Sequence, residues 1–133
     1  RPDLAGSGYR TDVVLVDGCD RSGTAPAFCA RAFYEMLRAR LRPHGLLVLN
    51  VIGEKHRIDA VVGAAAEAFG GRLIVMNVGV GGNRLLFAFN DADYVPDWQA
   101  LKLQAEFLGA RYGLDFPKFA KRLQRSCSIR GWR

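Results

Sequence analysis

The chain has 133 residues, of which 50% are hydrophobic and 24% charged, the size and composition of one ordinary globular domain with its own core. It contains no run near the roughly 18 apolar residues that a membrane span requires, so we expect no membrane partner. The polar start, Arg1-Pro2-Asp3, is not a secretory signal, and cytoplasmic localisation is the default expectation. Since no Met opens the chain, we interpret its start as trimmed, processed or engineered.

Cysteines, histidines and charge disfavour further classes of protein. Three cysteines without close spacing predict neither a disulfide framework nor a zinc site, and two histidines twelve residues apart disfavour a histidine metal site, so we expect no metal. A net charge of +6 is compatible with a polyanionic partner. The basic residues are spread along predicted helices, however, which is typical of a solvated helix face, and we do not expect nucleic acid as a partner. Their one cluster lies near the carboxyl end, at Lys118, Lys121, Arg122, Arg125, Arg130 and Arg133.

The first two predicted strands are continuous apolar runs at 12–17 and 46–51. Runs without alternation are typical of strands covered on both faces, as in a parallel sheet. Between them, a loop at 18–23 precedes a helix that we predict from about Ala25 to a stop at Pro43-His44-Gly45, with Thr24 as its cap and Pro26 in its first turn. Phe28, Phe33, Leu37 and Leu41 recur at helical spacing along it.

The second half of the chain continues the alternation. A helix at about 56–69 is followed by strands at 72–78 and 84–90, whose Gly-rich link predicts an antiparallel hairpin. Two helices follow at about 96–112 and 115–126, with Asp115 as N-cap of the second. This order predicts parallel βαβ units in a mixed α/β sheet. We predict one partial domain over 1–133, with a lead-in at 1–11, the sheet and its crossover helices at 12–90, and helices and tail at 91–133.

Two aspartates follow the first predicted strand. Ligands of open α/β sheets bind outside the carboxyl ends of the strands, where Asp17 ends the strand and Asp20 lies in the next loop. Two neighbouring carboxylates suit a cationic amine, or a general base with an orienting partner. The alternative is that these acids cap the next helix or bind water.

Other polar residues near the same edge are weaker candidates. Ser22 has no nearby histidine to activate it as a nucleophile, and two acids disfavour a thiolate at Cys19. Asn50 ends the second strand, where it either hydrogen-bonds a ligand or forms a turn. Glu54 and His56 form either an acid–base pair or the entry to the next helix.

The segment from Thr11 to Asn50 reads as a strand, D-x-x-D, a small spacer, A-F-Y, a helix and L-x-P-x-G. This pattern resembles that of the spermidine synthase (polyamine aminopropyltransferase) family. The late strand at 85–89 fits as well, although many S-adenosylmethionine methyltransferases share the strands and L-x-P-x-G. The resemblance implies a partial Rossmann-like, S-adenosylmethionine-dependent transferase fold, comprising carboxyl-terminal strands in a mixed sheet with a final antiparallel hairpin and helices on both faces. The residues in register are Asp12, Asp17, Asp20, Gly23, Phe33, Tyr34, Leu41, Pro43 and Gly45.

The resemblance also implies a reaction. Members of this family move an aminopropyl group from decarboxylated S-adenosylmethionine, their co-substrate, to the amine putrescine. An alkylamine with a pKa near ~10 must lose a proton before it can attack. The resemblance implies that Asp17 accepts this proton as the catalytic residue, that Asp20 holds the amine as a substrate-binding residue, and that no metal is needed.

The chain departs from the family pattern near this site. The Pro after the second aspartate is Arg21, the Pro after Gly23 is Thr24, the aromatic residue before the first aspartate is Thr11, and residues 77–82 lack an aromatic for the substrate pocket. A pair between Arg21 and Asp20 would weaken the hold on a diamine. Two alternatives therefore stay open: a class I S-adenosylmethionine-dependent methyltransferase fragment, and a non-catalytic binding or scaffold relative.

The family's cofactor-binding half has no counterpart in the sequence. Its Gly-rich turn, its first three strands and the acid that follows the turn by ~20 residues would all precede Asp12. We therefore expect this half to be absent, the cofactor-binding residues to be unknown, and the chain alone to be inactive and to bind no cofactor. An apolar strand edge exposed by half a sheet favours pairing with another chain, and we expect a homodimer.

Overall fold

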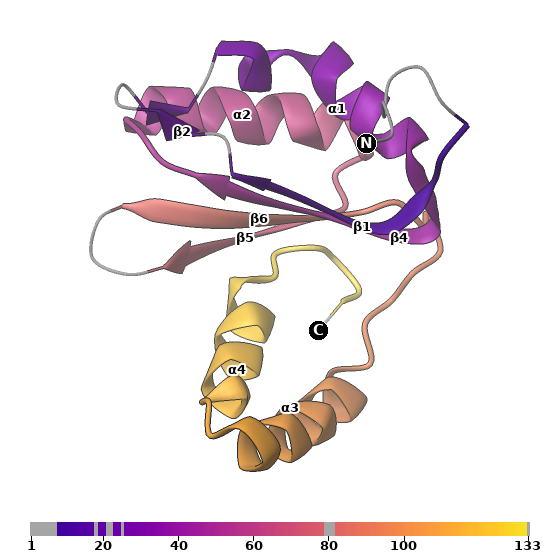
Figure 1. Cartoon of the computed structure of the whole chain (residues 1–133), viewed down its shortest axis with the longest axis vertical. Coiled ribbons are helices and arrows are strands. Elements are labelled where there is room, and N and C mark those ends of the chain that lie inside the picture. Colours follow the sequence, from indigo (N-terminus) through magenta and orange to yellow (C-terminus); the bar gives the residue numbers. More distant parts are fainter. Residues whose placement is uncertain (1–7, 18, 21–22, 25, 79–81, 133) are drawn as a thin grey trace. The chain divides into compact units, whose positions relative to one another are not determined.

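The structure is a computed structural model that describes residues 8–17, 19–20, 23–24, 26–78 and 82–132, with side chains left out at 19, 20, 23 and 24. The chain divides into two compact units, Arg1–Tyr94 and Val95–Arg133, and each is described here by itself. Figure 1 gives the labels of the elements. The expected single partial domain over 1–133 stays a prediction.

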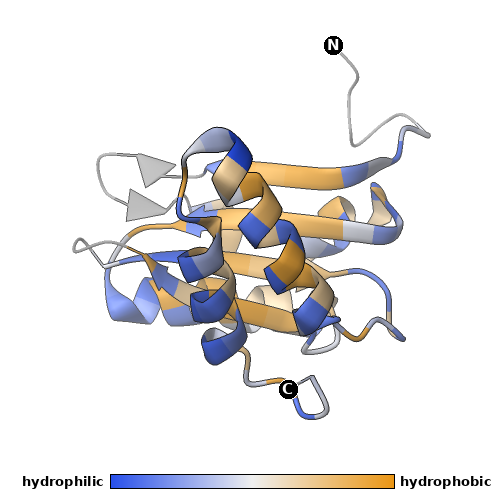
Figure 2. Ribbon diagram, turned by 90° about the horizontal axis from the view of Figure 1, so that it is seen from below, coloured by the Kyte–Doolittle hydropathy of each residue, from blue (hydrophilic) through white to orange (hydrophobic). Residues whose placement is uncertain are grey.

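The first unit is built on a four-stranded sheet in the order β1-β4-β6-β5. Strand β1 (Thr11–Asp17) runs parallel to β4 (Leu41–Val51), and β6 (Asn83–Phe89) runs antiparallel to both β4 and β5 (Leu73–Val78). The strands are hydrophobic along most of their length, as Figure 2 shows. The predicted parallel pair and closing antiparallel hairpin are confirmed, and so is the mixed sheet.

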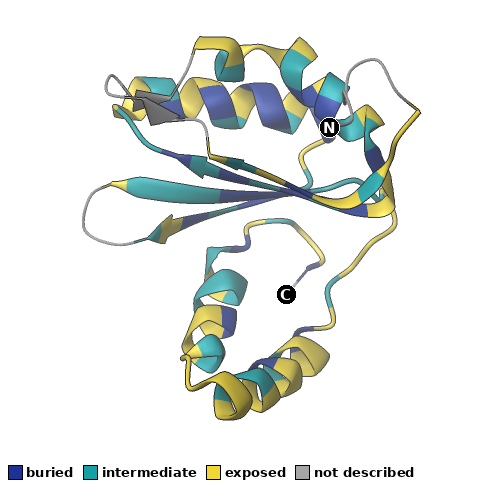
Figure 3. Cartoon of the chain, in the orientation of Figure 1, coloured by how far each residue is buried: buried dark blue, intermediate teal, exposed yellow. Residues whose placement is uncertain are grey.

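Two helices, α1 (Arg31–Ala39) and α2 (Lys55–Ala68), lie on one face of this sheet (Figure 1). Their apolar stripes and the inward side chains of the strands form one buried cluster, and α2 alternates between buried and exposed residues along its length (Figure 3). Helices on the second face of the sheet stay a prediction. The largest part of the cluster comes from Val14, Tyr34, Leu37, Leu47, Leu49, Val51, Val61, Ala65, Phe69 and Leu86.

The predicted start of the first helix was wrong. The chain first forms a short antiparallel pair, β2 (Cys19–Asp20) with β3 (Gly23–Thr24), and then a 3₁₀ turn, η1 (Pro26–Cys29), before α1 begins. The break lies at Ala30, which is extended with φ −99° and ψ 127° and cannot continue the helical hydrogen bonding. The rings of Phe28 and Phe33, expected on one helical stripe, instead contact each other across the break with centroids 4.8 Å apart.

The L-x-P-x-G segment is part of a strand rather than a helix end followed by a loop. Thr11 pairs with Leu41, but Val13 pairs with Leu46, so the residues in between bulge out of the ladder. A Cβ atom on Gly45 would lie 2.6 Å from the Cβ of Leu41, closer than two carbon atoms pack. The buried Leu41 therefore requires glycine four residues later, which explains this part of the motif.

Tyr34 connects α1 to the 3₁₀ turn. Its side chain is buried, and its hydroxyl donates a hydrogen bond of 2.6 Å to the carbonyl of Phe28. Burial, followed by the neighbouring Cys29, raises the pKa of Tyr34 above its ordinary value. The folded protein therefore keeps the phenol proton at a pH where the unfolded chain, with a tyrosine pKa of about 10, loses it.

We expect Tyr34→Phe to lower the free energy of unfolding by about 1 kcal/mol at neutral pH, because the hydrogen bond is lost while the ring is kept. Above pH ~10 the unfolded wild type binds fewer protons than the folded one, so its stability falls as pH rises, and the variant should lose less. Urea unfolding at neutral and alkaline pH measures both effects. A variant whose stability declines with pH as steeply as that of the wild type would contradict this account.

The second unit is a helical hairpin. Helix α3 (Trp98–Tyr112) begins with the Asp97 carboxylate accepting the backbone N–H of Ala100 at 3.0 Å, and it ends at Gly113 in the left-handed region with φ 68°. Helix α4 (Phe116–Ser126) begins with Asp115 accepting the N–H of Lys118 at 3.1 Å, which confirms the predicted cap. Among the described residues, no helix combines the length and apolar composition needed to cross a membrane.

Candidate functional site

The candidate site lies where β1 and β4 end side by side. Asp17 and Asn50 are partners in the parallel ladder, and the Asn50 Nδ2 donates a hydrogen bond of 3.2 Å to Asp17 Oδ1. Asp17 is exposed, and Asn50 is half-buried. The predicted position of Asp17 at the carboxyl end of the first strand is confirmed, whereas its catalytic role stays a prediction.

Strand alternation explains why these two side chains meet. Val14 and Val16 contact the core beneath α1 and α2, so Asp17, the next residue along, belongs to the opposite face of the sheet. Leu49 and Val51 are buried in the same core, which places Asn50 on the opposite face as well. The parallel register then places the two polar side chains next to each other at the carboxyl ends of β1 and β4. The arrangement offers a carboxylate whose orientation an amide helps to fix.

Asp20 is described only through its backbone. Its backbone pairs with Gly23 in the short hairpin that follows β1, three residues after Asp17. Its side chain, Arg21 and Ser22 lie outside what the structure describes. The predicted pair of acids facing one ligand, and the predicted contact of Arg21 with Asp20, are therefore still predictions.

Glu54 and His56 lie after the carboxyl end of β4. Glu54 is the N-cap residue of α2, and its Oε2 lies 3.3 Å from His56 Nδ1. The two residues form the helix entry and also contact each other, whereas an acid–base role for them stays a prediction. Both side chains are mostly exposed, so their mutual attraction is weak. Carboxylates therefore lie at the end of β1, from Asp17, and after the end of β4, from Glu54.

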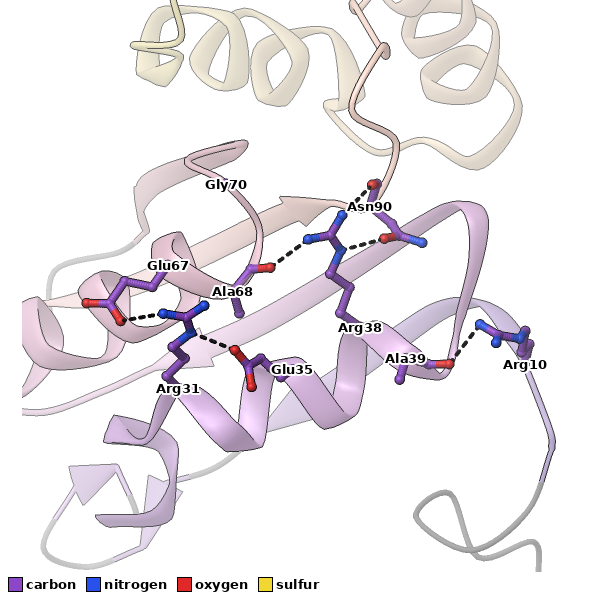
Figure 4. Close-up of a pocket in the computed structure, with 9 residues that line it drawn as sticks. All are labelled: Arg10, Arg31, Glu35, Arg38, Ala39, Glu67, Ala68, Gly70 and Asn90. Carbon is purple, nitrogen blue, oxygen red and sulfur yellow. Dashed lines mark hydrogen bonds and ion pairs between the residues drawn. The ribbon is translucent and has the colours of Figure 1, made fainter.

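A separate depression of about 510 Å³ lies in the first unit near the carboxyl ends of α1 and α2 (Figure 4). Arg38 organises it: its Nε donates to Asn90 Oδ1 and its Nη1 to the carbonyl of Ala68, each at 2.8 Å, and its guanidinium lies over the ring of Phe69. Leu46 pairs with Phe89 in the antiparallel ladder, so Asn90 lies at the amino end of β4, away from Asp17. We interpret this network as a structural clamp.

Arg72 and Arg31 extend this clamp. Arg72 Nε donates to the Phe89 carbonyl at 3.1 Å, and its pKa is lowered, first by burial and then by the charge of Arg38. Arg31 lies 2.6 Å from Glu35 Oε1 and 3.7 Å from Glu67 Oε2, joining α1 to α2. Sequence reasoning missed the clamp, because a helical arginine gives no signal of a partner more than fifty residues away.

Metal ligation finds no support in the described part of the chain. No group of three or more His, Cys, Asp or Glu side chains that could hold a metal ion occurs there. Cys29 is half-buried and Cys127 is buried, and the two form no disulfide with each other.

Comparison with curated proteins identifies relatives of one kind. A polyamine aminopropyltransferase of Chromobacterium violaceum is 31% identical over 116 residues, covering 87% of this chain and 44% of that protein. Two polyamine aminopropyltransferases of Neisseria meningitidis are 29% identical over 118 residues, covering 89% of this chain and 45% of theirs. The chain therefore spans less than half the length of these relatives. No protein-family model matches it.

Comparison with solved structures supports the fold. The crystal structure of human methyltransferase-like protein 13 in complex with SAH matches with a TM-score of 0.62 and 22% identity, covering 98% of this chain and 56% of that one. At this identity the match speaks for the fold alone. The predicted partial Rossmann-like transferase fold is confirmed.

Proposed function

Because the chain is related over most of its length to the polyamine aminopropyltransferases, the spermidine synthase family, we propose that it carries the amine-side residues of an aminopropyl transfer site. These relatives confirm the resemblance to the family that residues 11–50 indicated. The observation that carries the proposal is Asp17, an exposed carboxylate that ends β1 and accepts a hydrogen bond from Asn50. The complete reaction belongs to the longer protein that such relatives represent.

The reaction proposed is a displacement at carbon. A diamine nitrogen, once deprotonated, attacks the aminopropyl carbon bonded to the sulfonium of decarboxylated S-adenosylmethionine. A C–N bond forms, the C–S bond breaks, and its electron pair stays on sulfur as a neutral thioether. Asp17 accepts the proton that the ammonium group must lose and later passes it to water. We assign no residue of this chain to the adenosine of the donor.

Asn50 has a positioning role in this proposal. Its amide donates to one carboxylate oxygen of Asp17 and thereby restricts rotation of the carboxylate relative to the amine. Asp20 is proposed to hold the diamine, on the strength of the family pattern alone. The role of Asp20 depends on charge, since a carboxylate attracts an alkylammonium ion and helps to retain it until the proton is transferred.

We expect Asn50→Leu, in the protein that carries this chain, to lower kcat by about tenfold while KM for the diamine changes little, because the base is kept but misaligned. Asn50→Gln should recover part of the rate, since it restores a donor. The matched control is Gln99→Leu, which removes an exposed side-chain amide from α3 instead. Equal rates for wild type and Asn50→Leu would contradict the positioning role.

Methyl transfer is the second candidate function. Its support is the fold shared with a methyltransferase structure that holds SAH. It differs in needing no pair of acids to deprotonate an amine. A non-catalytic binding or scaffold role is the third alternative, favoured by Arg21, by the lack of pocket aromatics at 77–82 and by the basic carboxyl-terminal residues. We also propose that the chain alone is inactive and that isothermal titration calorimetry with either form of S-adenosylmethionine should show no tight binding.

We further propose that the chain forms a homodimer through β1. This strand is at the end of the sheet order, and Leu15 on it is 75% exposed. Exposed apolar edge strands favour pairing with another chain. Sedimentation velocity should show a dimer that Leu15→Lys weakens, whereas the control Leu103→Lys, at an exposed position of α3, leaves it intact. A monomer at every concentration tested would contradict this proposal.

A further inference from the structure

The two units differ strongly in charge. Residues 95–133 contain eight Lys and Arg against three Asp and Glu, a net charge of +5, whereas residues 1–94 contain eleven against ten, a net charge of +1. Nearly all of the net charge of +6 therefore belongs to the helical hairpin. The sequence alone favoured a solvated helix face for these residues, but the structure adds how they are arranged.

Two of the three acids of this unit serve as helix caps. The carboxylates of Asp97 and Asp115 accept backbone N–H groups at the starts of α3 and α4. Within the described residues, Lys118, Lys121 and Arg125 form no ion pair. These three positive charges repel one another, and an external anion would stabilise them.

The cations of α4 occupy one face of the helix. Residues at intervals of three, four and seven share a face, which aligns four of them into what we call the basic stripe: Lys118, Lys121, Arg122 and Arg125. The stripe extends over about 10 Å at the helical rise of ~1.5 Å per residue. Phosphate groups along a nucleic-acid strand are the partner that such a row of cations fits.

The apolar face of α4 is directed elsewhere. Phe119, Ala120 and Leu123 line a hollow of about 210 Å³ together with Leu101 and Leu108 of α3. An amphipathic helix that binds a membrane buries its apolar face in lipid, but this face is turned toward α3. The arrangement therefore favours a soluble polyanion over an anionic membrane.

Exposed aromatic rings accompany the cations at the turn between the helices. Tyr112 is 59% exposed, and the guanidinium of Arg111 lies over its ring, 5.5 Å from the centroid. Proteins that bind single strands combine a basic surface with aromatic rings on which bases stack. We propose that the α3–α4 unit binds single-stranded nucleic acid, with phosphates on the basic stripe and a base on Tyr112. The proposal is independent of aminopropyl transfer.

The test uses the whole chain and a fluorescein-labelled oligouridylate of roughly twelve nucleotides, within the site sizes known for such surfaces. Fluorescence anisotropy should show binding that weakens with salt. The logarithm of the association constant should fall with the logarithm of the salt concentration with a slope of about −2 to −3, as expected for three or four phosphate contacts on a single strand. The triple variant Lys118→Gln, Lys121→Gln, Arg125→Gln should weaken binding at least about tenfold and reduce the slope by about 2.

The matched control removes three cations from the first unit, with Arg31→Gln, Arg42→Gln and Lys55→Gln. It gives the same net charge, so it should bind nearly as the wild type does if the stripe is the binding surface. Equal weakening in both variants would overturn the proposal, because the effect would then be one of total charge. Binding to vesicles that contain phosphatidylserine without binding to the oligonucleotide would also overturn it, as would the absence of binding at low salt.

Discussion

Asp17→Asn lowers the rate of aminopropyl transfer by roughly 10²- to 10⁴-fold in the protein that carries this chain, the range typical of losing a general base. The asparagine keeps the shape of the side chain and an oxygen that accepts the hydrogen bond from Asn50, so the fold and the edge geometry are preserved. An amide cannot take the proton from the attacking amine. Steady-state kinetics with decarboxylated S-adenosylmethionine and a diamine should show the loss in kcat.

The matched control for this variant is Asp12→Asn. Asp12 is another exposed acid of β1, but it lies at the opposite end of the strand and contacts Arg42 at 3.0 Å. The same change of charge there should leave kcat within about twofold, since a surface ion pair contributes little. An Asp17→Asn enzyme with the wild-type rate would contradict the proposed base. Methyl transfer that persists in this variant would favour the methyltransferase alternative.

Phe69→Ala is expected to lower the free energy of unfolding by about 3 to 5 kcal/mol, the cost of deleting a large buried ring. Phe69 is fully buried at the end of α2, in the cluster that joins α2 to the sheet. The guanidinium of Arg38 lies 5.7 Å from its ring centroid, so the substitution also removes a surface on which the clamp rests. Urea unfolding followed by circular dichroism measures the change.

Phe107→Ala serves as the control for this substitution. Phe107 lies on α3 and is 61% exposed, so the same change of side chain should alter stability by no more than about 0.5 kcal/mol. A Phe69→Ala protein destabilised by less than about 1 kcal/mol would show that the core of the first unit is not organised as described here.

The strands of the four-stranded sheet were predictable from sequence because each contains a continuous apolar run, although β4 begins at Leu41, before the predicted start at 46, and the short pair β2 and β3 was predicted as a loop. The antiparallel hairpin was predictable from the Gly-rich link between two such runs. The first helix was misplaced because Phe28, Phe33 and Leu37 have helical spacing, and spacing alone does not show that Ala30 is extended. The ring contact of Phe28 with Phe33 and the hydrogen bond of Tyr34 to the Phe28 carbonyl both span the break, and helical spacing does not reveal either of them.

The candidate site was predictable in part. Asp17 was placed correctly, because an acid after an apolar run marks the carboxyl end of a strand. Asn50 was weighed only as a ligand contact or a turn residue, and its hydrogen bond to Asp17 depends on the register between two strands more than thirty residues apart. The Arg38 clamp gave no local signal for the same reason, since Asn90 lies 52 residues away.

The most direct test of the central claim is the identity of the product. The protein that carries this chain is incubated with a diamine and either decarboxylated S-adenosylmethionine or S-adenosylmethionine itself, and the products are resolved by mass spectrometry. We predict an aminopropylated amine from the decarboxylated donor and no methylated amine from the other. Methylated product from S-adenosylmethionine, with no aminopropylated amine, would contradict the claim.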